Sequence, residues 1–192
     1  MARLKVHDRW TVLPHLAIER LAENLWRVEG SLPDMPLRRV MTLARLGDGR
    51  VVVHGAIALA EAEMALVEEW GPPSFLLVPC GCHLLDAKAY RERYPDICVL
   101  CPRGARRRVV RVVPVEGDYD AFPPGEAVSL EHLDGVGRAE GAMLVRSDDG
   151  TTVVLGDLVS NMPHLPGAMG WFFRHLSEKK LSARNCSVPA SE

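Results

Sequence analysis

The interpretation of this chain of 192 residues depends on one stretch, Phe75-Leu76-Leu77-Val78-Pro79-Cys80-Gly81-Cys82-His83-Leu84-Leu85-Asp86. Its first four residues are apolar and predict a buried strand, which runs directly into a loop of thiol and imidazole side chains. In α/β proteins, loops at the ends of buried strands are where binding and chemistry are found. Two other strands with polar ends, at His54 and Asp157, are expected to bring their side chains to the same place and form one metal site.

A hairpin is predicted upstream of this stretch. Residues 39–46 and 51–54 are apolar segments on either side of Gly47-Asp48-Gly49-Arg50. Asp-Gly supplies the positive φ that a tight turn requires, so the two segments should pair as antiparallel strands.

A helix is predicted between the hairpin and the ligand loop. Residues 57–70 are rich in Ala, Leu and Glu, and Gly71-Pro72-Pro73 ends them. A strand, a helix and a strand joined by a right-handed crossover make a parallel pair whose carboxyl ends lie at one edge of the sheet. His54 and Cys80 should therefore lie at the same end of the sheet.

The rest of the chain is expected to be rich in antiparallel strands. We predict an edge strand at 22–28, a short helix at 86–94, strands at 97–101, 109–115 and 127–133, and a hairpin of 141–146 with 151–155. Residues 170–176 are suited to one more helix, whereas 177–192 are polar and aperiodic and predict a disordered tail. Residues 1–176 are thus expected to form a single domain.

Composition excludes several classes of protein. With 23 Lys and Arg against 25 Asp and Glu, and 47% hydrophobic residues, the chain has no electrostatic attraction to nucleic acid or anionic lipid, and a small-molecule substrate is the expected partner. The sequence shows no signal-peptide pattern and no apolar run long enough for a membrane span, so a cytoplasmic location is expected. The basic run 103–108 predicts a solvated turn or a rim that attracts anionic substrate.

The five cysteines suit thiols or metal ligands better than a disulfide framework. Thiolate and imidazole are ligands that zinc prefers, and Gly81 allows the backbone to turn so that Cys80, Cys82 and His83 face one ion. The alternative is a pair of small buried thiols beside a hydrogen-bonded histidine. A four-sulfur site with Cys98 and Cys101 is disfavoured, because residues three apart on a strand face opposite sides.

The order of elements and several motifs resemble the metallo-β-lactamase superfamily over about residues 25–161. The motifs are His54-Gly55-Ala56-Ile57, the Pro79-to-His83 loop and Gly156-Asp157-Leu158, and they are similar to those of a bacterial branch of the superfamily. The resemblance implies an α/β (α+β) fold, the αββα sandwich. It also implies metal ions that activate a water and that are held by a His-x-His-x-Asp-His loop. Here Cys80 and Cys82 stand in place of its first two histidines, and Leu84 and Leu85 in place of its Asp and last His.

Other positions depart from the superfamily further downstream. Its Gly-His pair falls at Gly137-Arg138, with Glu140 as a substitute ligand, and Asp157 matches its bridging Asp. Its final Gly-His has no counterpart, so a C-terminally truncated sandwich with one zinc or an atypical pair is expected. The resemblance implies Cys80, Cys82, His83 and Asp157 as ligands, His54 or Glu140 as a base, and Arg138 as the contact for negative charge on the substrate.

Three functions remain open at this point. The first is a metal-dependent hydrolase of esters, lactones or phosphoesters that uses a metal-activated water. The second is a non-catalytic relative that uses its pocket for binding or its open surface for dimerisation. The third is a metal-free cysteine hydrolase that uses Cys80 or Cys82 with His83. A homodimer is expected, because the lack of the last superfamily strand and helix would leave an open sheet edge.

Overall fold

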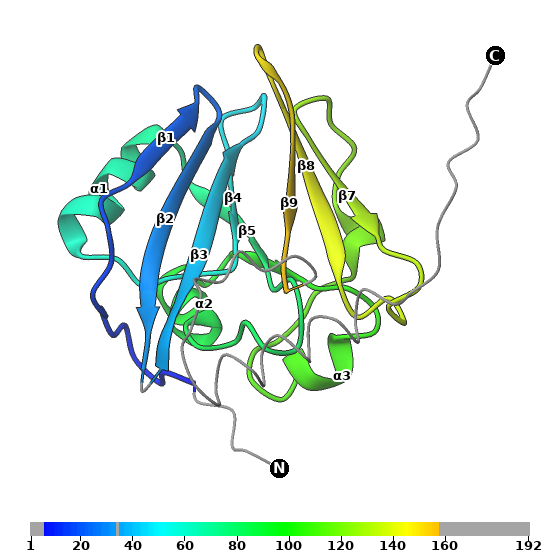
Figure 1. Cartoon of the computed structure of the whole chain (residues 1–192), viewed down its shortest axis with the longest axis horizontal. Coiled ribbons are helices and arrows are strands. Elements are labelled where there is room, and N and C mark those ends of the chain that lie inside the picture. The colour runs from blue at the N-terminus through cyan, green and yellow to red at the C-terminus, as the bar shows by residue number, and fades with distance from the viewer. Residues whose placement is uncertain (1–5, 34, 158–192) are drawn as a thin grey trace. The chain divides into compact units, whose positions relative to one another are not determined.

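The computed structural model describes residues 6–33 and 35–157, which form two β-sheets and the helices that flank them (Figure 1). The first sheet has six strands in sequence order. They are β1 (Glu19–Ala22), β2 (Leu25–Leu32), β3 (Met35–Arg45), β4 (Val51–His54), β5 (Pro73–Leu77) and β6 (Cys98–Leu100). The second sheet contains β7 (Val128–His132), β8 (Gly141–Ser147) and β9 (Gly150–Leu155). No helix in these ranges is long and apolar enough to cross a membrane.

The predicted hairpin is present as β3 and β4. The two strands are antiparallel, with Thr42 opposite His54 and Arg45 opposite Val51. Gly49 has a φ of 87°, which is the left-handed conformation that the tight turn requires. The predicted edge strand at 22–28 corresponds to β2, but β1 pairs outside it, so β2 is not at the edge of the sheet.

The crossover from β4 to β5 positions the ligand loop. These two strands are parallel, with His54 opposite Leu77, so their carboxyl ends lie at one edge of the sheet as predicted. Helix α1 (Glu61–Trp70) connects them and begins four residues later than the predicted range 57–70. Ala60 is extended at a ψ of 156°, and the residues before it are buried as a loop that packs under the sheet.

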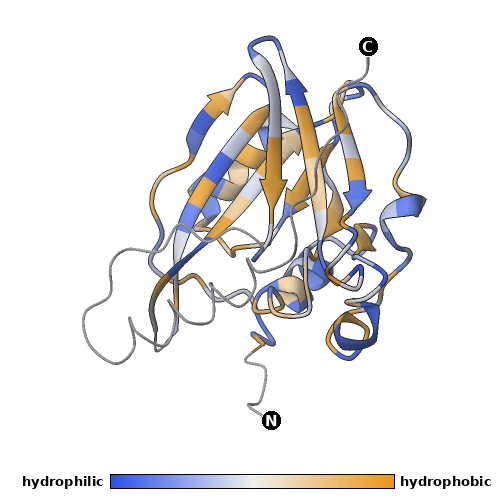
Figure 2. Cartoon of the chain, turned by 45° about the vertical axis from the view of Figure 1, so that its right-hand side comes forward, coloured by the Kyte–Doolittle hydropathy of each residue, from blue (hydrophilic) through white to orange (hydrophobic). Residues whose placement is uncertain are grey.

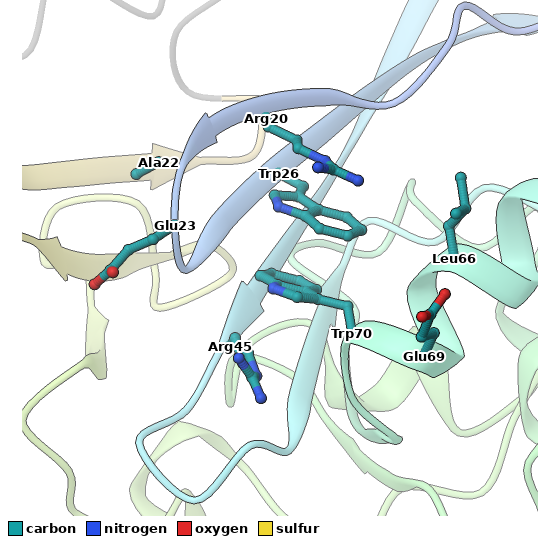
Figure 3. Close-up of a pocket in the computed structure, with 8 residues that line it drawn as sticks. All are labelled: Arg20, Ala22, Glu23, Trp26, Arg45, Leu66, Glu69 and Trp70. Carbon is teal, nitrogen blue, oxygen red and sulfur yellow. The ribbon is translucent and has the colours of Figure 1, made fainter.

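Two tryptophans hold the end of α1 against the sheet. The rings of Trp26 on β2 and Trp70 on α1 are stacked, with centroids 3.9 Å apart and an interplanar angle of 10°. The guanidinium of Arg20 lies over the outer face of Trp26, 4.8 Å from the ring centroid (Figure 3). The stack therefore fixes the helix that carries the chain from β4 to β5.

The short helix α2 (Ala87–Arg93) and strand β6 occur where they were predicted, but the strand expected at 109–115 is wrong. The chain forms α3 (Arg106–Val109) and then turns, with the Val113 N–H donating to the Val109 carbonyl at 3.1 Å. Val109 and Val113 are buried, whereas Val110 between them is exposed. This four-residue spacing is that of a helical face, and packing on the core outweighs the β-propensity of valine.

The core lies on both faces of the six-stranded sheet. One apolar cluster joins that sheet to all three α-helices, and a second joins its other face to the three-stranded sheet. Figure 2 shows the alternation of apolar and polar residues along the strands that this packing requires. Three layers of the predicted αββα sandwich are thus present in the described residues. The predicted helix at 170–176, the tail at 177–192 and any second helical layer lie outside them.

Candidate metal centre

The ligand loop and the end of β9 meet at the carboxyl edge of the parallel strands. The thiol of Cys80 donates to Asp157 Oδ2 at 3.4 Å, and His83 Nε2 lies 2.8 Å from Asp157 Oδ1. Gly156 makes this approach possible, because a Cβ at that position would lie 3.3 Å from the Pro79 ring. Residues more than 70 positions apart are therefore brought into direct contact.

Cys82 completes a group of three potential ligands. The thiol sulfurs of Cys80 and Cys82 and a carboxylate oxygen of Asp157 all lie within 4.8 Å of one another. The Cys82 N–H donates to the Cys80 sulfur at 3.2 Å, which bends the loop so that the two thiols approach each other. Cys80 is buried and Cys82 is exposed, so the group faces solvent from one side.

His54 lies beside this group at the end of β4. The histidine is 3% exposed, and its Nε2 has no hydrogen-bond partner among the described residues. Burial, together with the nearby charge of His83, lowers the pKa of His54 to about 3, so its imidazole is neutral at pH 7. A buried nitrogen without a partner destabilises a fold by about 1–3 kcal/mol and calls for a ligand that would satisfy it.

The pKa values of Cys80, Cys82 and His83 are shifted by their contacts with one another and with Asp157. The hydrogen bond from Cys80, with the positive charges of Arg108 and His83, lowers the pKa of Cys82 to about 6. That same hydrogen bond, burial and the charge of Asp157 raise the pKa of Cys80. Burial opposes a charged His83, but the hydrogen bond and charge of Asp157 outweigh it and raise the pKa of His83. The cluster is thus an anionic donor set partly balanced by His83.

Glu140 and Arg138, the two remaining predicted site residues, differ in position. Glu140 precedes β8, and its charge acts on His83, which places it beside the centre. Arg138 is exposed in the preceding loop, and its Nε lies 3.6 Å from an Asp134 carboxylate oxygen. Arg138 also has a positive φ of 52°, which places it in the left-handed conformation of a turn. The structure therefore brings together six of the seven predicted residues and leaves Arg138 at the surface.

Two residues at the site were not singled out from the sequence. Arg108 on α3 packs over Gly81, and a Cβ on that glycine would lie 2.7 Å from Arg108 Cδ. Tyr119 is buried, with a hydroxyl that has no hydrogen-bond partner in the described ranges, and burial, followed by the nearby charges of Cys101, Cys80 and Glu140, raises its pKa. The basic run 103–108 was the available signal for Arg108, whereas nothing in the sequence indicated Tyr119.

Other groups in the described chain are weaker candidates. Asp118, Asp120 and His132 also bring potential ligand atoms within 4.8 Å, and both His132 nitrogens are buried without a hydrogen-bond partner in the described ranges. Arg103 already pairs with both carboxylates, however, and His132 Nε2 lies 3.3 Å from Asp120 Oδ1. Cys98 and Cys101 belong to neither group of close ligand atoms within the described residues.

Figure 3 shows the lining of a hollow of about 600 Å³. The hollow lies at the amino end of the parallel strands, whereas the donor cluster lies at their carboxyl end. The hollow contains Arg45, which pairs with the first residue of β4, and Trp70, which ends α1. Its two tryptophan rings stack on each other, and its lining holds none of the thiols and imidazoles of the donor cluster. The hollow is therefore not the site.

The donor set suits a soft or borderline divalent cation. Two thiols, an imidazole and a carboxylate are the ligand types that zinc takes, and three close protein ligands with an open side are typical of catalytic zinc sites. The buried His54 nitrogen adds a second observation, since no atom of the described residues satisfies it and a water or an ion beside the cluster would do so. The residues therefore fit a zinc ion.

No family model matches the sequence, and no curated protein matches it significantly. Solved metallo-β-lactamases are structurally similar to it. The enzyme from Hirschia baltica is 14% identical, with 73% of this chain and 68% of that chain covered and a TM-score of 0.43. FIM-1 from Pseudomonas aeruginosa, in a mono-zinc form, is 12% identical, with 69% and 65% covered and a TM-score of 0.45. The enzyme from Erythrobacter litoralis is 13% identical, with 73% and 66% covered and a TM-score of 0.42.

These matches are to the family that the sequence motifs resemble. They extend over about 70% of the chain at low identity, and the chain spans about two thirds of the length of those proteins.

Proposed function

We propose that this chain is a metal-dependent hydrolase that cleaves ester, lactone or phosphoester bonds and binds zinc through Cys80, Cys82 and Asp157. The observation that supports it is the convergence of three ligand atoms within 4.8 Å beside a buried imidazole nitrogen without a partner. A purely structural thiol pair would account for Cys80 but not for the exposed Cys82 or for the His54 nitrogen.

The chain's own residues would then hold and move protons. His83 orients the Asp157 carboxylate through their 2.8 Å contact, as a hydrogen-bonded partner does for a ligand. His54, neutral at pH 7, has a nitrogen able to accept a proton beside the donor group, and Glu140 offers a second acceptor. A bound zinc ion supplies Lewis acidity and an activated water near neutral pH.

A cysteine hydrolase is the second candidate. Cys82 is exposed and has a pKa of about 6, so it is largely thiolate at pH 7 and suited to nucleophilic attack. His83 does not complete the usual pair, because its Nε2 faces Asp157 rather than the sulfur. This arrangement favours the metal-dependent hydrolase over the cysteine hydrolase, and an experiment can distinguish the two functions.

Metal analysis of the purified protein tests the proposal, with variants of single cysteines. We expect about one equivalent of zinc in the native protein and in Cys98→Ser, which lies outside the cluster, and loss of zinc in Cys80→Ser and Cys82→Ser. Hydrolysis of an ester, lactone or phosphoester panel should stop on chelation and return with zinc. Activity that survives chelation but is lost in Cys82→Ser would support the cysteine hydrolase instead.

A further inference from the structure

We propose that Arg108 binds an oxyanion of the substrate, so that the site selects substrates carrying a phosphate or carboxylate group over neutral ones. This inference depends on the proposed hydrolase function, because it assigns the substrate class of the same site. Arg108 would act by contact with the substrate and not by contact with the metal.

The position of Arg108 is set by the glycine between the two cysteines. Its aliphatic stem lies across Gly81, where an added Cβ would be 2.7 Å from Arg108 Cδ and 3.2 Å from its Cβ. The stem therefore lies against the ligand loop itself, and α3 holds it there through the buried Val109 next in sequence. The residue is exposed, so its guanidinium is accessible to solvent at the side where Cys82 is also exposed.

The guanidinium of Arg108 has no carboxylate partner among the described residues. Of the arginines around α3, Arg103 pairs with Asp118 and Asp120, and the Arg106 side chain donates to the Val115 carbonyl at 3.1 Å. Arg108 forms no such ion pair with the residues that the structure describes, and its charge acts on Cys82. Its planar fork of donors is therefore available for a phosphate or carboxylate, to which guanidinium binds through two parallel hydrogen bonds.

The charge of the centre explains why an arginine is needed there. With zinc bound, the two thiolates and the carboxylates of Asp157 and Glu140 would carry more negative charge than the cation and a protonated His83 together neutralise. An anionic substrate would be repelled from such a centre unless a nearby cation offset that charge. Arg108, which lies over the ligand loop, is placed to do so.

The kinetic test compares an anionic with a neutral substrate. For zinc-loaded Arg108→Ala we expect kcat/KM for p-nitrophenyl phosphate to fall by roughly 10-fold to 100-fold, as for loss of a charge-assisted hydrogen bond, and that for p-nitrophenyl acetate to stay within about 2-fold. Arg108→Lys should recover part of the loss, since it keeps the charge without the fork. Arg111→Ala, which removes an exposed arginine three residues further along the chain, should leave both substrates unchanged. An equal fall for both substrates in Arg108→Ala would overturn the inference and make Arg108 a counter-charge for Cys82.

A binding test does not need turnover. Phenylglyoxal modifies accessible arginines, and mass spectrometry reports each site separately. We expect inorganic phosphate or acetate to slow the modification of Arg108 but not of Arg111, and the effective ion shows which oxyanion the site takes. An unchanged rate at Arg108 with both ions would overturn the inference while leaving the hydrolase proposal intact. Protection of Arg108 in a protein that binds no zinc would leave the oxyanion site standing and overturn the proposed hydrolase.

Discussion

Two polar clusters lie at opposite ends of the same loop, and they differ in how well their atoms are satisfied. At the far end the buried Asp86 accepts hydrogen bonds on both oxygens, from His7 Nδ1 at 2.6 Å on one and the Ala58 N–H at 3.1 Å on the other. Arg39 Nη1 lies 2.6 Å from the second oxygen. At the near end the thiols, His83 and Asp157 converge, and the His54 nitrogen has no partner within the described ranges.

The difference separates a cluster that supports the fold from one that is suited to a ligand. A buried carboxylate with three donors is complete, and it ties the N-terminal segment and the loop after β4 to the loop after β5. Arg39 Nη2 is also buried without a partner in the described ranges, but it belongs to a guanidinium that already pairs with Asp86. The His54 nitrogen instead lies beside three close ligand atoms, where a water or an ion would satisfy it. Changes at the two clusters should therefore have different effects on folding and on metal binding.

The largest effect on stability is expected at Asp86. Asp86→Ala leaves Arg39 buried without its counter-charge, so the free energy of unfolding should fall by about 3–5 kcal/mol. Urea denaturation of the metal-free protein measures this. Asp8→Ala, which removes an exposed ion pair with Lys88, should give no measurable change. A small effect of Asp86→Ala would remove the distinction between the clusters.

The next effect is on metal affinity. Asp157→Asn should weaken zinc binding by at least about 100-fold, because a ligand matters more than the partners that orient it. Its effect on unfolding should be smaller than that of Asp86→Ala, since the Asp157 side chain is 41% exposed. Competition with a chromophoric zinc chelator gives the affinity, and Asp118→Asn in the second acidic group is the matched control. Equal loss of affinity in both variants would contradict the assignment of the centre.

The smallest effect is a pH dependence that comes from His54. Its pKa is about 3 in the folded protein and 6.5 in the reference state, so the unfolded chain takes up a proton below about pH 6.5 that the folded one does not. Stability should thus fall as the pH drops from about 6.5 toward 3, by roughly 2 kcal/mol at pH 5. The difference between pH 7 and pH 5 in urea denaturation should shrink by that amount in metal-free His54→Leu.

The half-buried His15 supplies the control for this experiment. His15→Leu should lose as much stability between pH 7 and pH 5 as the unmodified protein. If His54→Leu behaves like His15→Leu, the buried nitrogen is already satisfied, and the proposed difference between the two clusters is wrong.

Several elements follow from local patterns and were predicted correctly. The Asp48-Gly49 turn specifies its hairpin, and the crossover from β4 to β5 places His54 and Cys80 at one edge. The prediction of a strand at 109–115 was wrong, because β-propensity does not show which face of a valine run will be buried. The homodimer and the cytoplasmic location stay predictions.

The candidate site was predicted in part for the same reason. Strand ends are visible in the sequence, so the ligand loop and Asp157 could be named, and their convergence follows from the order of strands. The surface position of Arg138 depends on a single turn with a positive φ, and the contact of Arg108 with Gly81 depends on how α3 packs. Neither the turn at Arg138 nor the packing of α3 produces a periodic pattern in the sequence.

By itself, the sequence determined the strands, the turns and the chemical types of the donors, because these depend on neighbours a few residues away. Only the tertiary structure decided that Cys82 is exposed and Cys80 buried, that His54 lacks a partner in the described part of the chain, and that Arg108 lies over the loop. Burial and charge depend on atoms that pack from distant segments, so they arise only when two sheets and their helices close around the loop.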